Sequence, residues 1–173
     1  GIRRMGRMNE DCRCFSPSAD RDCHTLILGS MPSRVSLSGN EYYAHPRNAF
    51  WAIMASLFAF SREDTPYSRR LGILREHHIA LWDVLAVCER HGSADSAIRD
   101  EVANDLAAFL RQHPNVSRIL LNGSGAASFF NKYQRGNIGS HIRIIQLPST
   151  SPANATMSFA EKLSVWRIVS LPV

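Results

Sequence analysis

The chain has 173 residues, 45% of them hydrophobic, and a formal net charge of +5 at pH 7. This length and apolar content predict one globular domain that buries its own core. No apolar run approaches the roughly 20 residues of a membrane-spanning helix, and the first residues lack the apolar core of a signal peptide, so we expect a soluble cytoplasmic protein with no membrane partner. The positive charge is compatible with DNA binding, although many soluble domains share it.

The cysteines are even in number, which raises the question of disulfides or a metal site. They are Cys12, Cys14, Cys23 and Cys88. Their spacing is unlike common zinc or iron–sulfur frameworks. We therefore expect reduced thiols, no metal and no cofactor.

The first half of the chain predicts a leader, a strand and a helix. Residues 1–20 are rich in Arg, Ser, Asn and Pro with little periodicity, and predict a partly mobile leader before a folded domain at residues 21–173. A strand is predicted at residues 24–28. Apolar residues then recur at helical spacing from Phe50 onward, so Asn48 is expected near a helix N-terminus.

The second half continues the alternation of strands and helices. A short helix or turn is expected from Leu71, residues 84–90 are ambiguous, and a helix is predicted between the polar cap at residues 93–96 and His113, with Val102 on its apolar stripe. Further strands are predicted at residues 78–83, 117–121 and 142–147. Further helices are predicted after Asn122 and at residues 157–171, and loops at residues 134–140 and 148–154.

This alternation predicts an α/β fold, a single-domain three-layer α/β/α sandwich with a central four-stranded parallel sheet. The turns after its strands then share the carboxyl edge of the sheet, where open α/β folds bind ligands. These turns follow Leu28, Trp82, Leu121 and Leu147.

Blocks of sequence at and near these turns resemble a known family. The blocks are GSMPS at residues 29–33, YYAHPRNAFW at 42–51, NGS at 122–124 and LPSTSPAN at 147–154. Together they resemble the uracil-DNA glycosylase superfamily, and within it the hypoxanthine-DNA glycosylase branch.

The resemblance implies a monofunctional DNA glycosylase of base excision repair. Such an enzyme flips a deaminated base, here hypoxanthine, out of duplex DNA and hydrolyses its N-glycosidic bond, leaving an abasic site. The alternatives are a uracil or G:U/G:T mismatch-specific glycosylase and, from another class, a non-catalytic module that binds DNA or nucleotides. We expect a monomer whose partner is damaged duplex DNA.

Asn48 is the predicted catalytic residue. Its amide could orient water through the carbonyl oxygen or donate to a base carbonyl, whereas the competing interpretation is that it caps the helix. In the resemblance, Met31 stands where related branches carry an Asp or Asn that handles water, and Leu147 replaces the His of some branches. Both departures imply a slower enzyme that relies on Asn48.

The other predicted site residues bind the base or the DNA. Tyr43 is expected to stack on the extruded base, and polar groups at the strand ends to select it. The base-binding set is Gly29, Ser30, Met31, Pro32, Tyr43, Asp83 and Asn122. The DNA-binding set is Arg34, Arg47, Ser149, Thr150, Ser151 and Asn154, with Arg135 also expected at the rim. His45 could act in catalysis or merely orient a neighbour. Lys132 and Lys162 lie on predicted helices outside the motifs, so no Schiff base is expected.

Overall fold

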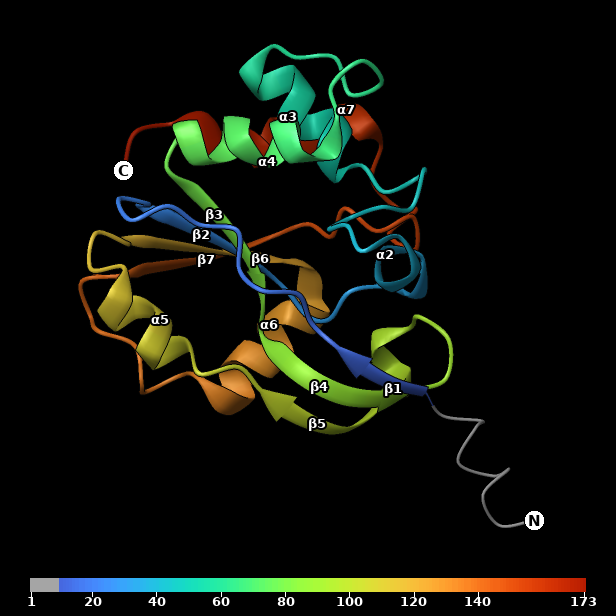
Figure 1. Cartoon of the computed structure of the whole chain (residues 1–173), viewed down its shortest axis with the longest axis vertical. Helices are drawn as coiled ribbons and strands as arrows, with labels where there is room; N and C mark the ends of the chain where they lie inside the picture. Colours follow the sequence, from blue (N-terminus) through green and yellow to red (C-terminus); the bar gives the residue numbers. More distant parts are fainter. Residues whose placement is uncertain (1–9) are drawn as a thin grey trace.

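A parallel sheet forms the centre of the computed structural model, which describes residues 10–173 (Figure 1). Its strand order is β3-β2-β6-β7, and each neighbouring pair is parallel. The strands are β2 (Thr25–Gly29), β3 (Ile79–Asp83), β6 (Arg118–Asn122) and β7 (Arg143–Leu147). The four predicted strands are thus confirmed to within about one residue at their ends.

The apolar runs of the inner strands divide their side chains between two cores. In β2, Leu26 and Leu28 pack into one cluster, whereas Ile27 packs into the other. In β6, Leu120 shares the second cluster with Ile27. Successive side chains of a strand point to opposite faces, so a continuous apolar run is what a sheet covered on both faces requires.

Helices cover both faces of this sheet, which confirms the predicted three layers. Figure 1 shows α3, α4 and α7 over one face and α5 and α6 over the other. These helices are α3 (Phe50–Phe58), α4 (Tyr67–Glu76), α5 (Leu106–Gln112), α6 (Gly123–Tyr133) and α7 (Phe159–Trp166). Shorter helical segments are α2 (Arg34–Gly39), η1 (Asp95–Ala97) and η2 (Arg167–Ser170).

A second, antiparallel sheet was not predicted. It has the order β1-β4-β5, formed by β1 (Glu10–Arg13), β4 (Leu85–Arg90) and β5 (Ile98–Ala103). The expected leader is therefore wrong from residue 10 onward, and its first nine residues lie outside the described part of the chain. Cys12 is buried opposite Cys88, and Ser18 exchanges backbone hydrogen bonds with Leu81. Pairing with distant strands orders this segment, and a local periodicity cannot reveal such pairing.

Residues 98–103 form a strand instead of the first turns of the predicted helix. Val102, placed on the apolar stripe, is 57% exposed, and β5 pairs with β4. The helix begins only at α5, where the side chain of Asp105 accepts a hydrogen bond from the Ala108 N–H. This cap defines the helix start and leaves the preceding residues free to pair.

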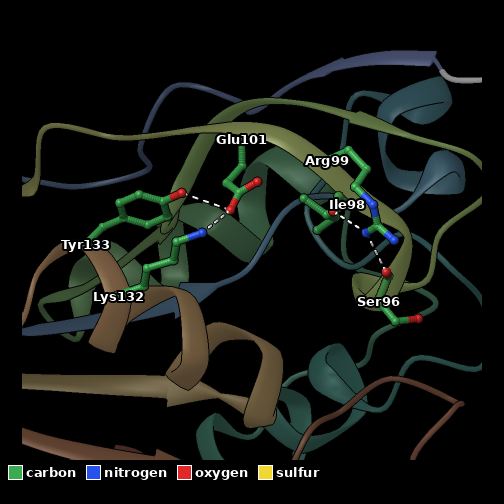
Figure 2. A network of polar contacts seen from close by, with 6 residues as sticks. All are labelled: Ser96, Ile98, Arg99, Glu101, Lys132 and Tyr133. Carbon is green, nitrogen blue, oxygen red and sulfur yellow. Dashed lines mark hydrogen bonds and ion pairs between the residues drawn. The ribbon is translucent and has the colours of Figure 1, made fainter.

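Side chains tie β5 to α6 (Figure 2). Glu101 Oε1 accepts hydrogen bonds from Lys132 Nζ and Tyr133 Oη, both at 2.8 Å. The hydrogen bond from Lys132 is the main reason why the pKa of Glu101 falls to about 2. Arg99 donates to the backbone carbonyls of Ser96 and Ile98, which closes the turn between η1 and β5. The β4–β5 hairpin, residues 85–103, is thus held against α6, one of the helices that cover the parallel sheet.

Two further features are absent from the part of the chain that the structure describes. None of the helices within residues 10–173 combines the length and the apolar character that a membrane span needs. Over the same residues, no group of three or more His, Cys, Asp or Glu side chains is arranged to hold a metal ion.

Candidate active site

A cleft of about 610 Å³ opens at the carboxyl edge of the parallel sheet. Turns that follow all four of its strands line the cleft, together with residues from 42–48 and from the β4–β5 hairpin. The predicted site residues that line it are Gly29, Ser30, Met31, Pro32, Tyr43, Asn48, Asp83, Asn122, Ser149, Thr150, Ser151 and Asn154. Segments far apart in sequence therefore meet, as the predicted topology requires.

The floor of the cleft is the turn after β2, and it has no room for a side chain at its first residue. A Cβ on Gly29 would lie 2.6 Å from Asp83 Oδ1 and 3.2 Å from Tyr43 Oη. The Gly29 and Ser30 carbonyls accept hydrogen bonds from the backbone of Val84 and Leu85, at 2.8 and 3.1 Å. The floor is consequently rigid, and two polar side chains approach it closely.

Tyr43 forms an aromatic wall with Phe50. Their ring centroids are 4.1 Å apart with an interplanar angle of 31°. Tyr43 has a φ of +56°, which lies in the left-handed region and is uncommon for an aromatic residue. Burial raises the pKa of its hydroxyl, so Tyr43 remains protonated. The Tyr43 oxygen is buried and makes no direct hydrogen bond among the described residues, although the Asn122 side chain lies close enough to offset part of the rise in its pKa.

Asn48 lies at the entrance to α3, as predicted. Its Oδ1 accepts a hydrogen bond from the Phe50 N–H at 2.9 Å, which closes the turn that leads into the helix, whereas the N-cap position itself is Ala49. Within the described chain, no hydrogen bond from its Nδ2 is found. The bond to Phe50 therefore fixes the orientation of an amide that lines the cleft and whose NH₂ group has no acceptor in the described chain.

His45 lies beside Asn48 and also lines the cleft. The backbone N–H of Arg47 donates to His45 Nδ1 at 3.0 Å. Neutral His45 therefore carries its proton on Nε2. Backbone bonding holds this ring in place, whereas its part in catalysis stays an open prediction.

Asn122 and the loop at residues 148–154 hold each other. Asn122 Nδ2 donates to Thr150 Oγ1, and Asn122 Oδ1 accepts from the Thr150 N–H, both at 3.0 Å. Thr150 is only 1% exposed, and its carbonyl accepts from Ala49 N at the start of α3. These bonds give Thr150 a positioning role, and its predicted DNA contact stays a prediction. The base-binding role of Asn122 stays a prediction.

The basic residues are placed differently from what we expected. Arg34 and Arg47 are exposed and adjoin cleft residues in sequence, but neither lines the cleft. Arg135 follows the far end of α6 and donates to Asn131 Oδ1. Helix α6 starts at the carboxyl edge of the sheet and runs back, so its last residue is carried away from the cleft. The expectation that Arg135 rims the site is therefore wrong.

Two carboxyl groups face each other across the floor, and the sequence analysis missed one of them. Asp83 ends β3 and is 3% exposed, while Asp95 enters from η1 and accepts a hydrogen bond from Ser30 Oγ at 2.7 Å. Burial and then the negative charge of Asp95 raise the pKa of Asp83 to about 7, although Arg90 lowers it. The local sequence around Asp95 predicts only a helix cap. In the structure Asp95 packs against Gly125, where a Cβ would collide with its carboxyl group, and no local pattern in the sequence indicates this contact.

Comparison with known proteins supports the same assignment as this geometry. The family model for the uracil DNA glycosylase superfamily matches residues 17–170. The chain belongs to this superfamily. Its cleft is built from the four blocks that carry the resemblance, so the sequence motifs and the structure agree on one site.

Relatives within the superfamily cover most of the chain. A "Hypoxanthine DNA glycosylase" from Methanosarcina acetivorans is 34% identical over 157 residues, which is 91% of this chain and 96% of the relative. A protein of the same name from Methanosarcina barkeri is 35% identical over 115 residues, or 66% and 73% of the two chains. The solution NMR structure of a Methanosarcina acetivorans protein, described provisionally as a uracil DNA glycosylase, has a TM-score of 0.77 at 32% identity and covers 94% of this chain and 100% of its own.

Proposed function

We propose that this member of the superfamily is a monofunctional DNA glycosylase that removes hypoxanthine from duplex DNA and leaves an abasic site. The observation that carries the proposal is the Asn48 amide, which is fixed at the N-terminus of α3 with its NH₂ end available at the cleft. The names of the two Methanosarcina relatives support hypoxanthine as the substrate base.

The cleft suits a single extruded nucleotide. Its volume of about 610 Å³ lies within the range of small-molecule sites, and Tyr43 packed on Phe50 supplies an aromatic wall. A planar base stacks on such a wall whatever its identity. We therefore assign base holding to Tyr43, and assign base selection to the polar groups around the floor.

Breaking the N-glycosidic bond makes the sugar cationic and the base anionic. Asn48 Nδ2 can donate to the departing base, and the second lone pair of its Oδ1 can orient the attacking water. The N-terminus of α3 adds partial positive charge on the side of the base. An uncharged amide thus serves both ends of the reaction, and this suits a site with Met31 in its first turn.

The lysines fit a monofunctional reaction. Lys132 is paired with Glu101, and Lys162 is 6% exposed within α7. Neither lines the cleft. A Schiff base with the sugar, and the strand cleavage that follows from it, has no amine at this site. Damaged DNA is then the partner, with Arg34 and Arg47 as its phosphate contacts; the monomeric state and the cytoplasmic location stay predictions.

The test uses duplex oligonucleotides that carry a single hypoxanthine, uracil or xanthine, or a G:T mismatch. Under single-turnover conditions with EDTA present, we expect the hypoxanthine strand to break only after alkali treatment, because the product is an abasic site. Preferred release of uracil or of mismatched thymine would favour the alternative glycosylase. Binding without release of any base would favour the non-catalytic module.

A further inference from the structure

Asp83 is a buried carboxyl group that the mechanism above does not use. It lines the cleft and is 3% exposed, and its Oδ2 atom is buried with no hydrogen-bond partner in the described chain. Its backbone carbonyl is held by Asn104 Nδ2 at 2.8 Å. A buried polar atom without a partner lowers folding stability, so its retention in a ligand cleft indicates that a ligand completes it.

Tyr43 presents a second such atom beside Asp83. A Cβ on Gly29 would touch both Asp83 Oδ1 and Tyr43 Oη, so the two side chains reach the same few ångströms of the floor. The Tyr43 hydroxyl likewise makes no direct hydrogen bond in the described chain, and its polar neighbours are the Asn122 side chain and Asp83. Asp83 and Tyr43 together therefore offer a hydrogen-bond donor and an acceptor beside the aromatic wall on which the base would stack.

The charged and titratable groups around Asp83 come from several elements. Asp95 approaches from η1, Arg90 from β4 and Cys14 from the segment after β1, while Tyr42, Tyr43 and Tyr67 approach from the aromatic side. His45 lines the same cleft. Asp95 accepts a hydrogen bond from the Ser30 hydroxyl, whereas no hydrogen bond to the Asp83 carboxyl group is found in the described chain. Two neighbouring carboxyl groups cannot both ionise easily, and Asp83 is the one placed to keep a proton.

Resting on the proposed function, we propose that Asp83 binds the extruded base as a neutral carboxylic acid, donating its O–H to a carbonyl oxygen of the base and accepting the adjacent ring N–H. A neutral acid offers one donor and one acceptor, whereas a carboxylate only accepts and would repel the carbonyl. The raised pKa of Asp83 is consistent with this state near neutral pH.

This arrangement names the substrate class by its chemistry. Deamination converts the amino group of adenine into a carbonyl and places a hydrogen on the neighbouring ring nitrogen. The resulting lactam edge, C6=O beside N1–H in hypoxanthine, pairs with a neutral carboxyl group through two hydrogen bonds. The acid O–H also stabilises negative charge that spreads onto the carbonyl oxygen as the base departs. Departure of the base does not require proton transfer from Asp83, because the carboxylic acid acts only as a hydrogen-bond donor.

Asp83→Asn is the decisive variant, because an amide keeps one donor and one acceptor but does not titrate in this range. Single-turnover excision of hypoxanthine should be measured from pH 5.5 to 9. In the parent protein the rate should fall by about tenfold per pH unit above the pKa of Asp83. In Asp83→Asn this fall should be absent, and Asp83→Ala should be slower than Asp83→Asn by about a hundredfold at every pH.

Asp95→Asn provides a second test, in which the direction of the shift in the pH profile is predicted. Removing the neighbouring negative charge favours ionised Asp83, so the fall in rate should move to lower pH by about one unit. The amide oxygen of this variant can still accept the hydrogen bond from the Ser30 hydroxyl, so the variant removes the charge of Asp95 but keeps this contact. Carbon-13 NMR of labelled Asp carboxyl groups should show one titration near pH 7 that Asp83→Asn removes.

The outcomes separate the two proposals. If the parent protein excises no deaminated base, the proposed function fails and this inference fails with it. If the parent is active but Asp83→Asn keeps the same fall in rate at high pH, or is as slow as Asp83→Ala at every pH, only the role of Asp83 is overturned. A carboxyl titration near pH 4 for Asp83 would also overturn it, and this readout does not depend on activity.

Discussion

The two ends of the Asn48 amide have different surroundings. Oδ1 is bonded to the first turn of α3, whereas Nδ2 has no partner within the described residues. One residue therefore contributes both to the turn that begins α3 and to the proposed chemistry, and a single substitution changes both. The two contributions can still be separated, because they depend on opposite ends of the side chain.

We expect Asn48→Ala to slow single-turnover base release by at least about a hundredfold, the scale of one lost transition-state hydrogen bond. Loss of the hydrogen bond to the Phe50 N–H should also cost about 1 kcal/mol of folding stability. Asn48→Asp is the matched control, since a carboxylate can still accept from the Phe50 N–H but has no N–H to donate. It should melt like the parent protein and lose activity like the Ala variant. Equal rates for parent and Ala variant would move catalysis to His45.

Gly29 is constrained by its neighbours, not by its backbone angles. The methyl group of Gly29→Ala would displace the Asp83 carboxyl group, which lies 2.6 Å from its position. We expect the variant to lose about 1–3 kcal/mol of stability and to release bases poorly. Gly39→Ala is the control, because its nearest contact is Ala44 Cβ at 4.0 Å. Thermal melts and excision assays of the two variants should differ clearly, and similar behaviour would contradict the tight floor.

At the scale of elements, success of prediction followed the range of the interactions. β2 and β6 are apolar runs covered on both faces, and α3 carries a stripe of apolar residues. Each of these elements can therefore be predicted from its own local sequence. β1, β4 and β5 contain charged residues in place of a continuous apolar run, and they are ordered by pairing across up to 80 positions of sequence. Asp95 was missed for the same reason, since only that pairing brings η1 to the cleft.

The contact between β5 and α6 should be sensitive to acid. The pKa of Glu101 is lowered by its bonds to Lys132 and Tyr133, so its stabilising effect is full above its ordinary pKa and is lost as pH falls toward about 2. Glu101→Gln should lower stability at pH 7 by under about 1 kcal/mol. The difference between variant and parent should vanish near pH 2 in thermal melts. Glu76→Gln, which breaks an exposed pair with Arg69, should have a smaller effect at pH 7.

At the scale of the whole molecule, the exposed arginines lie at different distances from the cleft. Arg47 stands between the cleft residues His45 and Asn48, whereas Arg135 follows the other end of α6. On the proposed function, we expect a duplex laid over the cleft to contact Arg47 and to leave Arg135 free. The arrangement therefore offers a pair of charge-matched variants.

Arg47→Ala should weaken binding to duplex DNA with or without a damaged base, because phosphate contacts are not specific to sequence. The slope of log affinity against log salt concentration should fall by about 0.9 for one lost phosphate contact. Arg135→Ala should change neither quantity. Titrations by fluorescence anisotropy at several salt concentrations measure both, and equal effects of the two variants would place the duplex elsewhere.

The hairpin that carries Asp95 is joined to the parallel sheet by Val84 and held in place by contacts such as that of Glu101 with α6. Asn48, by contrast, is held by α3 and the loop at Thr150. Changes within the hairpin can thus alter the charge beside Asp83 without moving the amide proposed to break the bond. In evolutionary terms, the range of accepted bases and the power to release them are free to diverge separately, and an inserted or substituted hairpin is where new base preferences would arise in this fold.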